Sequence, residues 1–288
     1  MLWQKGRSSD NVEEAGGGGG GPGIGPIHLG LGGTIIAIVI AMIFPSTRGI
    51  IFGLLGGGGT VGNTPAQTTR ADMSDPQVQF VSKILGSTED VWTATFQQMG
   101  KQYVDPKLVL FHGQVGTACG GASAAVGPFY CPGDRRVYLD LDFFQELATR
   151  FHSSSDFARA YVVAHEVGHH VQDQLGIMDM EQQLAQQGQP MKGANGLSVR
   201  LELQADCFAG VWANKSQQQL QWLQPGDIES ALNAASQIGD DTLEKEAQGV
   251  VVPDSFTHGT SVQRVKWFKT GFQSGDVNAC DTFHAQAL

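Results

Sequence analysis

The stretch Ala-His-Glu-Val-Gly-His at residues 164–169 has the pattern H-E-x-x-H and lies in an apolar run with helical periodicity. On an α-helix, His165 and His169 lie on one face, one turn apart, so their ring nitrogens can converge on a single ion. Such convergence suits the tetrahedral coordination of zinc. Glu166 faces the same site, where it can take a proton from a zinc-bound water. This combination is typical of zinc peptidases.

The helix that carries this motif is expected to run from about Phe157 to Gln174, capped by residues 153–156 and ended by Gly176. Its apolar residues cover a broad arc, so most of the helix is expected to be buried. Buried histidines and a buried glutamate need partners, and a metal would supply them. Gly168 costs about 1 kcal/mol in a helix interior, which indicates that another segment packs closely there.

A zinc site of this kind needs a third protein ligand and an open position for water. Residues 198–213 form a second strongly helical run, in which Glu202 and Asp206 are four apart and share one face. On an otherwise apolar helix we interpret these acids as inward-facing rather than as a solvated ridge. Glu202 is the candidate third ligand of one Zn²⁺ ion. Asp206 is expected to accept a hydrogen bond from the spare ring nitrogen of a ligand histidine.

Five short segments along the chain together form a recognisable combination of motifs. They are Gly-Pro-Phe-Tyr-Cys-Pro at 127–132, Val-Tyr-Leu-Asp-Leu at 137–141, His-Glu-Val-Gly-His-His at 165–170, Glu-Leu-Gln-Ala-Asp-Cys at 202–207 and His-Gly-Thr-Ser at 258–261. Together they resemble the bacterial YpfJ-like family of neutral zinc metallopeptidases, from about residue 70 to the C-terminus. The N-terminal Ser-Asp-Asn-Val-Glu at 9–13, with an anchor after it, fits the same resemblance. The resemblance implies a zincin with His165, His169 and Glu202 as zinc ligands and Glu166 as general base.

By the same resemblance, His258 lies in a short motif near the C-terminus. It is the candidate catalytic donor of a hydrogen bond to the oxyanion that forms when water attacks a peptide carbonyl. Arg264 or Tyr161 could serve instead. His170 points about 100° away from His169 on the helix and is interpreted as structural. No pattern supports a role for three other histidines, His112, His152 and His284.

The four cysteines include no C-x-x-C pair, which argues against a zinc ribbon and favours two disulfides. Cys119 and Cys131 bracket a short segment, whereas Cys207 and Cys280 lie far apart. The sequence leaves three pairings open, and four buried thiols as well. A Cys119–Cys131 bond would close a hairpin-like loop, and Cys280 would then return to Cys207. If the bonds form, the catalytic part lies in an oxidising compartment.

Residues 27–44 contain two polar side chains, His28 and Thr34, and no charged one, so the stretch is just long enough to cross a bilayer. The alternatives are a buried core helix and a cleaved signal peptide, for which no A-x-A-like cut site is obvious. We predict a single-pass signal anchor. Lys5 and Arg7 before the span, against Arg48 after it, favour a cytoplasmic N-terminus only weakly.

The expected domain organisation follows from these segments: a cytoplasmic tail and glycine-rich linker at 1–26, a transmembrane anchor at 27–47, a flexible tether at 48–73 and a zinc metallopeptidase domain at 74–288. The catalytic domain is expected on the periplasmic or extracytoplasmic side of the bacterial inner membrane. The net charge of −10 argues against nucleic acid as a partner, because phosphate binding needs a basic surface. Protein or peptide substrates and the membrane are the expected partners, and oligomeric state is left open.

The fold class is predicted to be α+β, mainly helical, with a small mixed or antiparallel sheet. Strands are expected at 107–111 and 137–141, and the segment 119–142 is the candidate sheet edge for a peptide substrate. Residues 178–195 are interpreted as a surface connection or part of a cleft rim. Further helices are expected at 76–85, ended by Gly86, and at 87–100, 143–149, 227–238, 242–247 and 261–272.

The sequence therefore predicts a membrane-anchored zinc endopeptidase. The alternative is a catalytically silent, zinc-containing module that binds peptides or proteins at the membrane. Such a structural zinc site normally fills its fourth position with Cys or His, and Cys207 is the one residue near Glu202 that could close it. A disulfide at Cys207 would remove the option that this cysteine closes the site.

Overall fold

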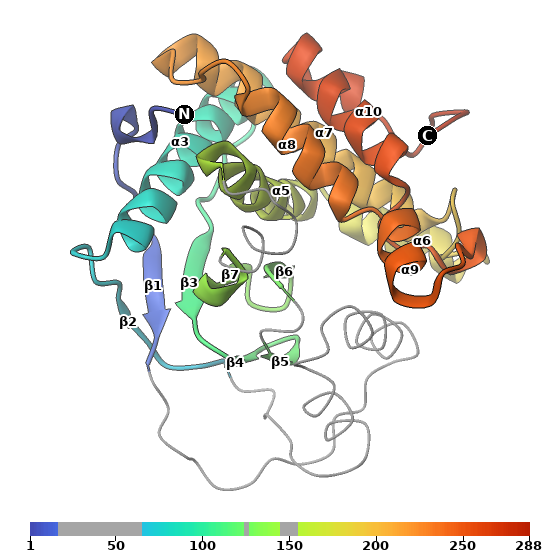
Figure 1. The fold of residues 1–288 in the computed structure, drawn as a ribbon, viewed down its shortest axis with the longest axis horizontal. Coiled ribbons are helices and arrows are strands. Elements are labelled where there is room, and N and C mark those ends of the chain that lie inside the picture. The colour runs from blue at the N-terminus through green and yellow to red at the C-terminus, as the bar shows by residue number, and fades with distance from the viewer. Residues whose placement is uncertain (17–64, 124–126, 145–154) are drawn as a thin grey trace, which may run out of the picture.

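The computed structural model describes residues 1–16, 65–123, 127–144 and 155–288, which form a small sheet beside a larger layer of helices (Figure 1). Five strands make a mixed sheet in the order β2-β1-β3-β7-β6, and two more form the β4–β5 hairpin. The strands are β1 (Val12–Ala15), β2 (Thr68–Arg70), β3 (Lys107–Phe111), β4 (Gln114–Thr117), β5 (Gly120–Ser123), β6 (Phe129–Cys131) and β7 (Arg136–Asp140). Both predicted strands are therefore present. The strand predicted at 107–111 has these bounds, and the strand predicted at 137–141 is shifted by one residue to 136–140.

Both faces of the sheet are covered. Strand β3 pairs in parallel with β1 and with β7, whereas β2 and β6 pair antiparallel at the two edges. Leu108 and Leu110 face the main core beneath the helices, while Val109 and Phe111 face a smaller cluster with the β4–β5 hairpin. A central strand buried on both sides needs a continuous apolar run, which explains the Leu-Val-Leu-Phe sequence at 108–111.

The helical layer is built around the motif helix. The helices are α3 (Pro76–Gln98), α5 (Asp156–Gln174), α6 (Ile177–Gln186), α7 (Leu197–Leu220), α8 (Asp227–Gln237), α9 (Asp240–Gln248) and α10 (Ser261–Ser274). Short 3₁₀ turns are η1 (Trp3–Lys5), η4 (Pro253–Ser255) and η5 (Val277–Cys280). Helix α5 contacts α3, α7 and α8 as well as the strands β6 and β7 (Figure 1). The helix begins one residue before its predicted start and ends at Gln174 as predicted, and Ser155, within the predicted capping segment 153–156, is its cap.

Helix α3 is one continuous helix, so the prediction of two helices meeting at Gly86 is wrong. Its start is as expected, with Asp75 as the cap and Pro76 in the first turn. Gly86 lies in the middle because the N-terminal segment crosses there: a Cβ on Gly86 would lie 2.5 Å from the carbonyl oxygen of Arg7. Close packing, rather than helix termination, accounts for this glycine.

Two other predictions for helical segments need correction. Residues 178–195, interpreted as a connection, contain most of α6, and α7 runs seven residues past the predicted end at 213. Of the predicted helix at 143–149, only residues 143 and 144 are described and helical, and the others lie outside the described residues. The helices expected at 227–238, 242–247 and 261–272 correspond to α8, α9 and α10.

The N-terminal residues 1–16 are part of the folded domain and not a separate cytoplasmic tail. Strand β1 lies between β2 and β3, and the backbone N–H of Gly16 donates to the carbonyl of Gln67 over 2.8 Å. The buried carboxylate of Glu89 accepts hydrogen bonds from three N-terminal side chains, Arg7, Ser9 and Asn11. The predicted tail at 1–26 therefore contains strand β1, the predicted tether at 48–73 contains strand β2, and the fold begins before residue 74.

The predicted anchor at 27–47 lies outside the described residues. Among the residues that the structure does describe, no helix is long and apolar enough to cross a membrane. The pairing of β1 with both β2 and β3 places residues 12–15 in the same sheet as residues 68–70 and 107–111. A single crossing between these parts would put them on opposite sides of a membrane, so the predicted single-pass topology does not fit the fold.

Both predicted disulfides form, as Cys119–Cys131 and Cys207–Cys280, which resolves the three pairings that the sequence left open. The first ties the end of the β4–β5 hairpin to strand β6. The second ties η5, near the C-terminus, to the middle of α7.

Candidate metal centre

Two adjacent helices supply the candidate ligands. Helix α5 carries His165 and His169, and α7 carries Glu202. The two helices approach closely at Gly168, where a Cβ would lie 3.1 Å from the carbonyl oxygen of Ala205, as the glycine in the motif predicted. This approach brings Nε2 of His165 to 3.1 Å from Oε2 of Glu202, and Nε2 of His169 to 3.5 Å from Oε1.

The three side chains fit a zinc ion. One potential ligand atom from each of His165, His169 and Glu202 lies within 4.8 Å of the other two. Ligand atoms about 2 Å from a tetrahedral zinc lie roughly 3.3 Å apart, close to the separations found here. Two imidazoles and a carboxylate are also a donor set that zinc accepts in catalytic sites, with a position left for water. The structure thus brings together the three residues that the sequence indicated.

Both histidine rings are held so that Nε2 faces Glu202. Nδ1 of His165 donates to Oδ1 of Asp206 over 2.9 Å, and Nδ1 of His169 donates to Oε1 of Gln172 over 2.8 Å. A donating Nδ1 leaves the lone pair on Nε2 for a metal. The role of Asp206 was expected from the sequence, but that of Gln172 was not. The sequence feature that could have indicated Gln172 is an amide side chain on the buried face of the motif helix, one turn after His169.

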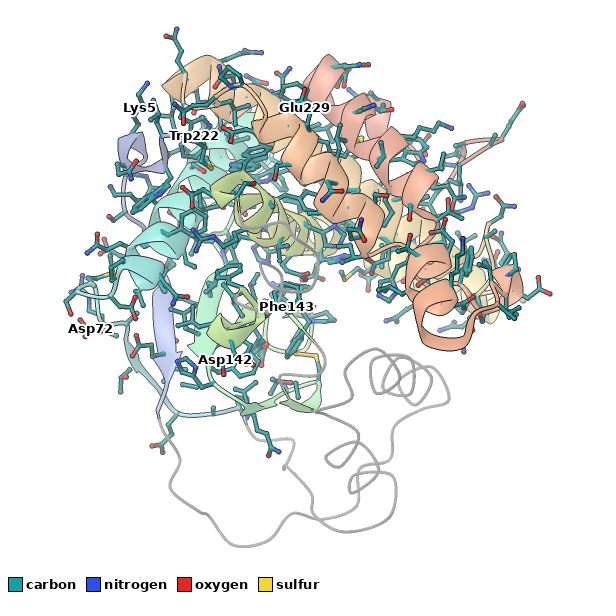
Figure 2. The ribbon with its side chains drawn as sticks, viewed as in Figure 1. Lys5, Asp72, Asp142, Phe143, Trp222 and Glu229 are labelled. Atoms are coloured by element: carbon teal, nitrogen blue, oxygen red, sulfur yellow. A yellow bond between two sulfur atoms is a disulfide. The ribbon has the colours of Figure 1, made fainter. Side chains whose placement is uncertain are left out.

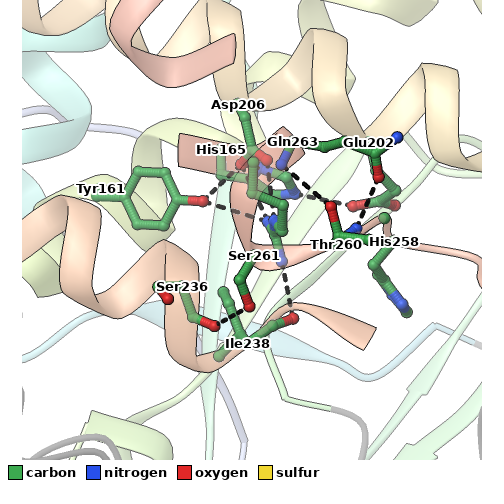
Figure 3. Close-up of polar contacts among 12 residues, drawn as sticks. Tyr161, His165, Glu202, Asp206, Ser236, Ile238, His258, Thr260, Ser261 and Gln263 are labelled. Atoms are coloured by element: carbon green, nitrogen blue, oxygen red, sulfur yellow. Dashed lines mark hydrogen bonds and ion pairs between the residues drawn. The ribbon is translucent and has the colours of Figure 1, made fainter. Parts of the chain in front are cut away.

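Asp206 is the centre of a buried network (Figure 3). Arg264 forms two hydrogen bonds with its carboxylate, from Nε over 2.8 Å and from Nη2 over 3.0 Å, and the Tyr161 hydroxyl donates to Oδ1. Burial alone would raise the pKa of Asp206, but the charges of Arg264 and His165 outweigh it and lower the pKa to about 2. Asp206 therefore stays ionised and holds His165 in one orientation.

This network contains two of the three candidates for the oxyanion donor, Arg264 and Tyr161. Arg264 is 3% exposed and also donates to the carbonyl of Ile238 over 3.2 Å. Tyr161 is fully buried and hydrogen-bonded to Asp206. Both side chains are thus committed to positioning Asp206 rather than to binding a substrate.

His258 lies in the loop before α10, and its side chain is 36% exposed. Its Nδ1 is 3.2 Å from Oδ1 of Asp240, the first residue of α9. The other oxygen of Asp240 accepts the backbone N–H groups of Thr257, His258 and Gly259. Asp240 therefore fixes both the loop and the ring, and leaves Nε2 of His258 without a hydrogen-bond partner among the described residues. Burial lowers the pKa of His258, but hydrogen bonding to Asp240 and the charge of Glu202 raise it overall.

Glu166, the candidate base, follows His165 on α5 and is buried. Burial raises the pKa of its carboxyl group, and the neighbouring charges of His165 and His169 oppose that rise. A carboxylate whose pKa moves toward neutrality is a better proton acceptor than an exposed one. The environment of Glu166 is therefore suited to general-base catalysis.

A second buried acid is Glu181 on α6, in the segment for which the sequence predicts a surface connection and no functional residue. Its side chain is largely buried, and burial together with the charge of Glu202 raises its pKa to about 7, while His169 opposes the shift. Among the described residues, Glu181 has no ion-pair partner. It adds a carboxyl group that gains a proton near neutral pH.

Replacing Glu181 by glutamine should stabilise the metal-free protein at high pH. Because the folded-state pKa is about 7, above the ordinary 4.5, the wild type loses stability as the pH rises through 7. The variant should therefore be more stable by about 1–3 kcal/mol at pH 8, and the difference should vanish near pH 4. Urea unfolding across this pH range measures it. Glu229→Gln, at an exposed position of α8, is the control, and a pH-independent difference would contradict the expectation.

Two further histidines among the described residues, His170 and His284, have a structural and an exposed position. His170 is buried, with Nε2 2.7 Å from the carbonyl of Val104 and Nδ1 3.1 Å from the Tyr130 hydroxyl, so its structural interpretation is confirmed. His284 is exposed and pairs with Asp281. His152 lies outside the described residues.

Cys207 cannot close the metal site, because its sulfur is bonded to Cys280. The alternative of a structural zinc clasp that uses Cys207 is therefore removed. What remains is two imidazoles from an H-E-x-x-H helix, a glutamate from a second helix, and the buried carboxyl group of Glu166 beside them. This is the site architecture of the zinc peptidases that use glutamate as the third ligand.

The chain belongs to the family described as "Putative neutral zinc metallopeptidase", whose model matches residues 1–283. It is 48% identical over 287 residues to the uncharacterized protein YpfJ of Escherichia coli, which covers 98% of this chain and 99% of that protein. It is 47% identical over 220 residues to an uncharacterized protein of Mycobacterium tuberculosis, which covers 73% of each chain. No solved structure matches the chain. The family match includes the N-terminal residues that the fold places in the sheet.

Proposed function

We propose that the protein is a zinc-dependent endopeptidase in which His165, His169 and Glu202 hold one zinc ion and Glu166 is the general base. The observation that carries the proposal is the convergence of these three ligand atoms beside a buried glutamate. Membership of a zinc metallopeptidase family supports a hydrolase acting on peptide bonds.

When bound, the zinc ion supplies a Lewis acid and lowers the pKa of water at the site toward 7. Glu166 accepts the proton of the attacking water and passes it to the nitrogen of the leaving amine. His258 donates a hydrogen bond from Nε2 to the oxygen of the scissile carbonyl, where negative charge develops. Asp240 holds the His258 ring through Nδ1, while Asp206 and Gln172 hold the two ligand imidazoles. The residues thus divide into one base, one oxyanion donor and three positioning groups.

Strand β6 is the proposed edge for the peptide substrate. It is the last strand of the sheet and pairs on one side with β7. Its Tyr130 hydroxyl donates to Asp173 over 2.8 Å and contacts His170, so the strand is tied directly to the motif helix. A peptide added to such an edge would gain backbone hydrogen bonds at a fixed position relative to α5. Such binding would support cleavage of the substrate within an extended segment of the peptide.

The proposal is tested by digesting a library of peptides with the zinc-loaded full-length protein and reading the products by mass spectrometry. Internal cleavage products are expected, together with their loss after chelation and their return when zinc is added back. A library that stays intact with the zinc-loaded protein would reject the endopeptidase assignment.

Glu202→Ala should remove stoichiometric zinc. Loss of one of three protein ligands is expected to weaken zinc binding more than the roughly 10- to 100-fold that loss of an outer hydrogen-bond partner costs. Metal analysis after dialysis against zinc-free buffer measures the effect, with Glu229→Gln as the control that keeps its zinc. Zinc content equal to that of the wild type would reject Glu202 as a ligand.

We also propose that the domain lies on the extracytoplasmic side of the bacterial inner membrane, with residues 27–44 in contact with the bilayer. Two disulfides and the apolar composition of 27–44 support this location. The expected result is a membrane-fraction protein whose cysteines resist alkylation in intact cells until a reductant is added. Free thiols in the cytosolic fraction would overturn the proposal.

A further inference from the structure

A second cluster of potential ligands lies at the sheet and shares no residue with the first centre. His112 directly follows β3, Asp140 is the last residue of β7, and Asp142 comes two positions later. Strands β3 and β7 are parallel neighbours in which Phe111 is in register with Asp140, so their carboxyl ends place these groups together. Figure 2 shows Asp142 at the end of the sheet that continues into the β4–β5 hairpin.

The cluster has the spacing of a metal site. One ligand atom from each of His112, Asp140 and Asp142 lies within 4.8 Å of the other two. Nδ1 of His112 is 3.3 Å from Oδ1 of Asp142, and Oδ1 of Asp140 accepts the backbone N–H of Asp142 over 3.0 Å. This last bond fixes the turn after β7 and the orientation of the Asp140 carboxylate.

The environment of Asp140 is a second, independent observation that points to a bound cation. Its side chain is fully buried, and Oδ2 has no hydrogen-bond partner among the described residues. Through the alternation of β7, Asp140 lies on the same face as Tyr138, which belongs to the small apolar cluster with Val109 and Phe111. A buried carboxylate oxygen without a partner is costly in such surroundings, and a bound cation removes that cost.

We propose that His112, Asp140 and Asp142 form a second metal site that takes a divalent transition-metal ion such as Zn²⁺ or Mn²⁺. Calcium and magnesium prefer ligands that are all oxygen, whereas one imidazole with two carboxylates suits zinc or manganese. The side chains of His112 and Asp142 are 67% and 63% exposed, so an ion can enter and keep water ligands.

The ion joins the end of β3 to the turn after β7. The ion neutralises the fully buried carboxylate of Asp140. Because it binds the folded chain and not the unfolded one, it raises the free energy of unfolding. No local sequence pattern supports His112, because Asp140 lies in β7, 28 residues later, and Asp142 lies in the turn after it, 30 residues later.

The test compares the wild-type full chain with the double variant His112→Ala/Asp142→Asn. The matched control is His284→Ala/Asp281→Asn, which removes another exposed His–Asp pair, with Nδ1 and Oδ1 2.9 Å apart. Each protein is equilibrated with Zn²⁺ and its bound metal is counted, in the wild-type background and with Glu202→Ala. The double variant is expected to bind one equivalent less than the wild type and the control in both backgrounds. Because Glu202→Ala removes zinc from the first centre, an equivalent that is still lost in that background belongs to the second site.

Equal metal content in the double variant and the wild type would overturn the second site. Loss of the same equivalent in the control would also overturn it, by showing non-specific surface binding. A second measurement needs no variant: Mn²⁺ added to the wild-type protein should broaden the NMR signals of the His112 imidazole well before those of His284. Simultaneous broadening of the two rings would contradict the proposal.

Discussion

Replacing Glu166 by glutamine is expected to slow peptide hydrolysis strongly while the protein keeps its zinc. Glutamine has nearly the shape of glutamate but cannot accept the proton of the attacking water, so kcat should fall by about 100- to 10,000-fold. The zinc content should stay at the wild-type level, because His165, His169 and Glu202 are unchanged. Steady-state hydrolysis of a peptide that the wild type cleaves, together with metal analysis of the same samples, measures both quantities.

The control for this variant is Glu229→Gln, which makes the same chemical change at an exposed position on α8 and should leave kcat unchanged. Equal cleavage by the Glu166 variant and the wild type would reject the general-base role. Loss of zinc along with activity would show instead that Glu166 is required for the metal site itself.

Replacing Arg264 by methionine is expected to destabilise the fold strongly. Asp206 is fully buried, and Arg264 is its bidentate cationic partner. Removing one partner of a buried pair leaves an uncompensated charge, which costs about 3–5 kcal/mol. The free energy of unfolding in urea, measured on zinc-loaded and metal-free protein, should fall by this amount.

Two comparison variants make the Arg264 prediction specific. Lys269→Met, on the exposed side of the same helix, should change the free energy of unfolding by less than about 0.5 kcal/mol. Adding Asp206→Asn to Arg264→Met should restore part of the lost stability, because position 206 then carries no unpaired buried charge. A loss below about 1 kcal/mol in the Arg264 variant would contradict the assigned role of the pair.

The first metal centre was largely predictable because its chemistry is local. His165 and His169 are one helical turn apart, and Glu202 and Asp206 repeat the same spacing on a second apolar helix. What could not be predicted depends on tertiary contacts. Gln172 is one amide on a buried helix face, and the orienting role of Asp240 depends on a contact with His258, 18 residues later.

The errors in the fold have a related physical origin. Gly86 was interpreted as a helix end because glycine weakens an isolated helix, but in the folded chain it accommodates the backbone of Arg7. Strand β1 has the sequence Val-Glu-Glu-Ala, which carries little β-strand signal of its own. Its place in the sheet depends on pairing with residues more than 50 positions away, and no local pattern predicts that.

The proposed function depends on a zinc ion held by His165, His169 and Glu202. Anomalous diffraction from crystals of the zinc-loaded protein, measured on both sides of the zinc absorption edge, tests it most directly. An anomalous peak is expected about 2 Å from Nε2 of both histidines and from a carboxylate oxygen of Glu202. A zinc-loaded crystal with no peak between these three side chains would contradict it.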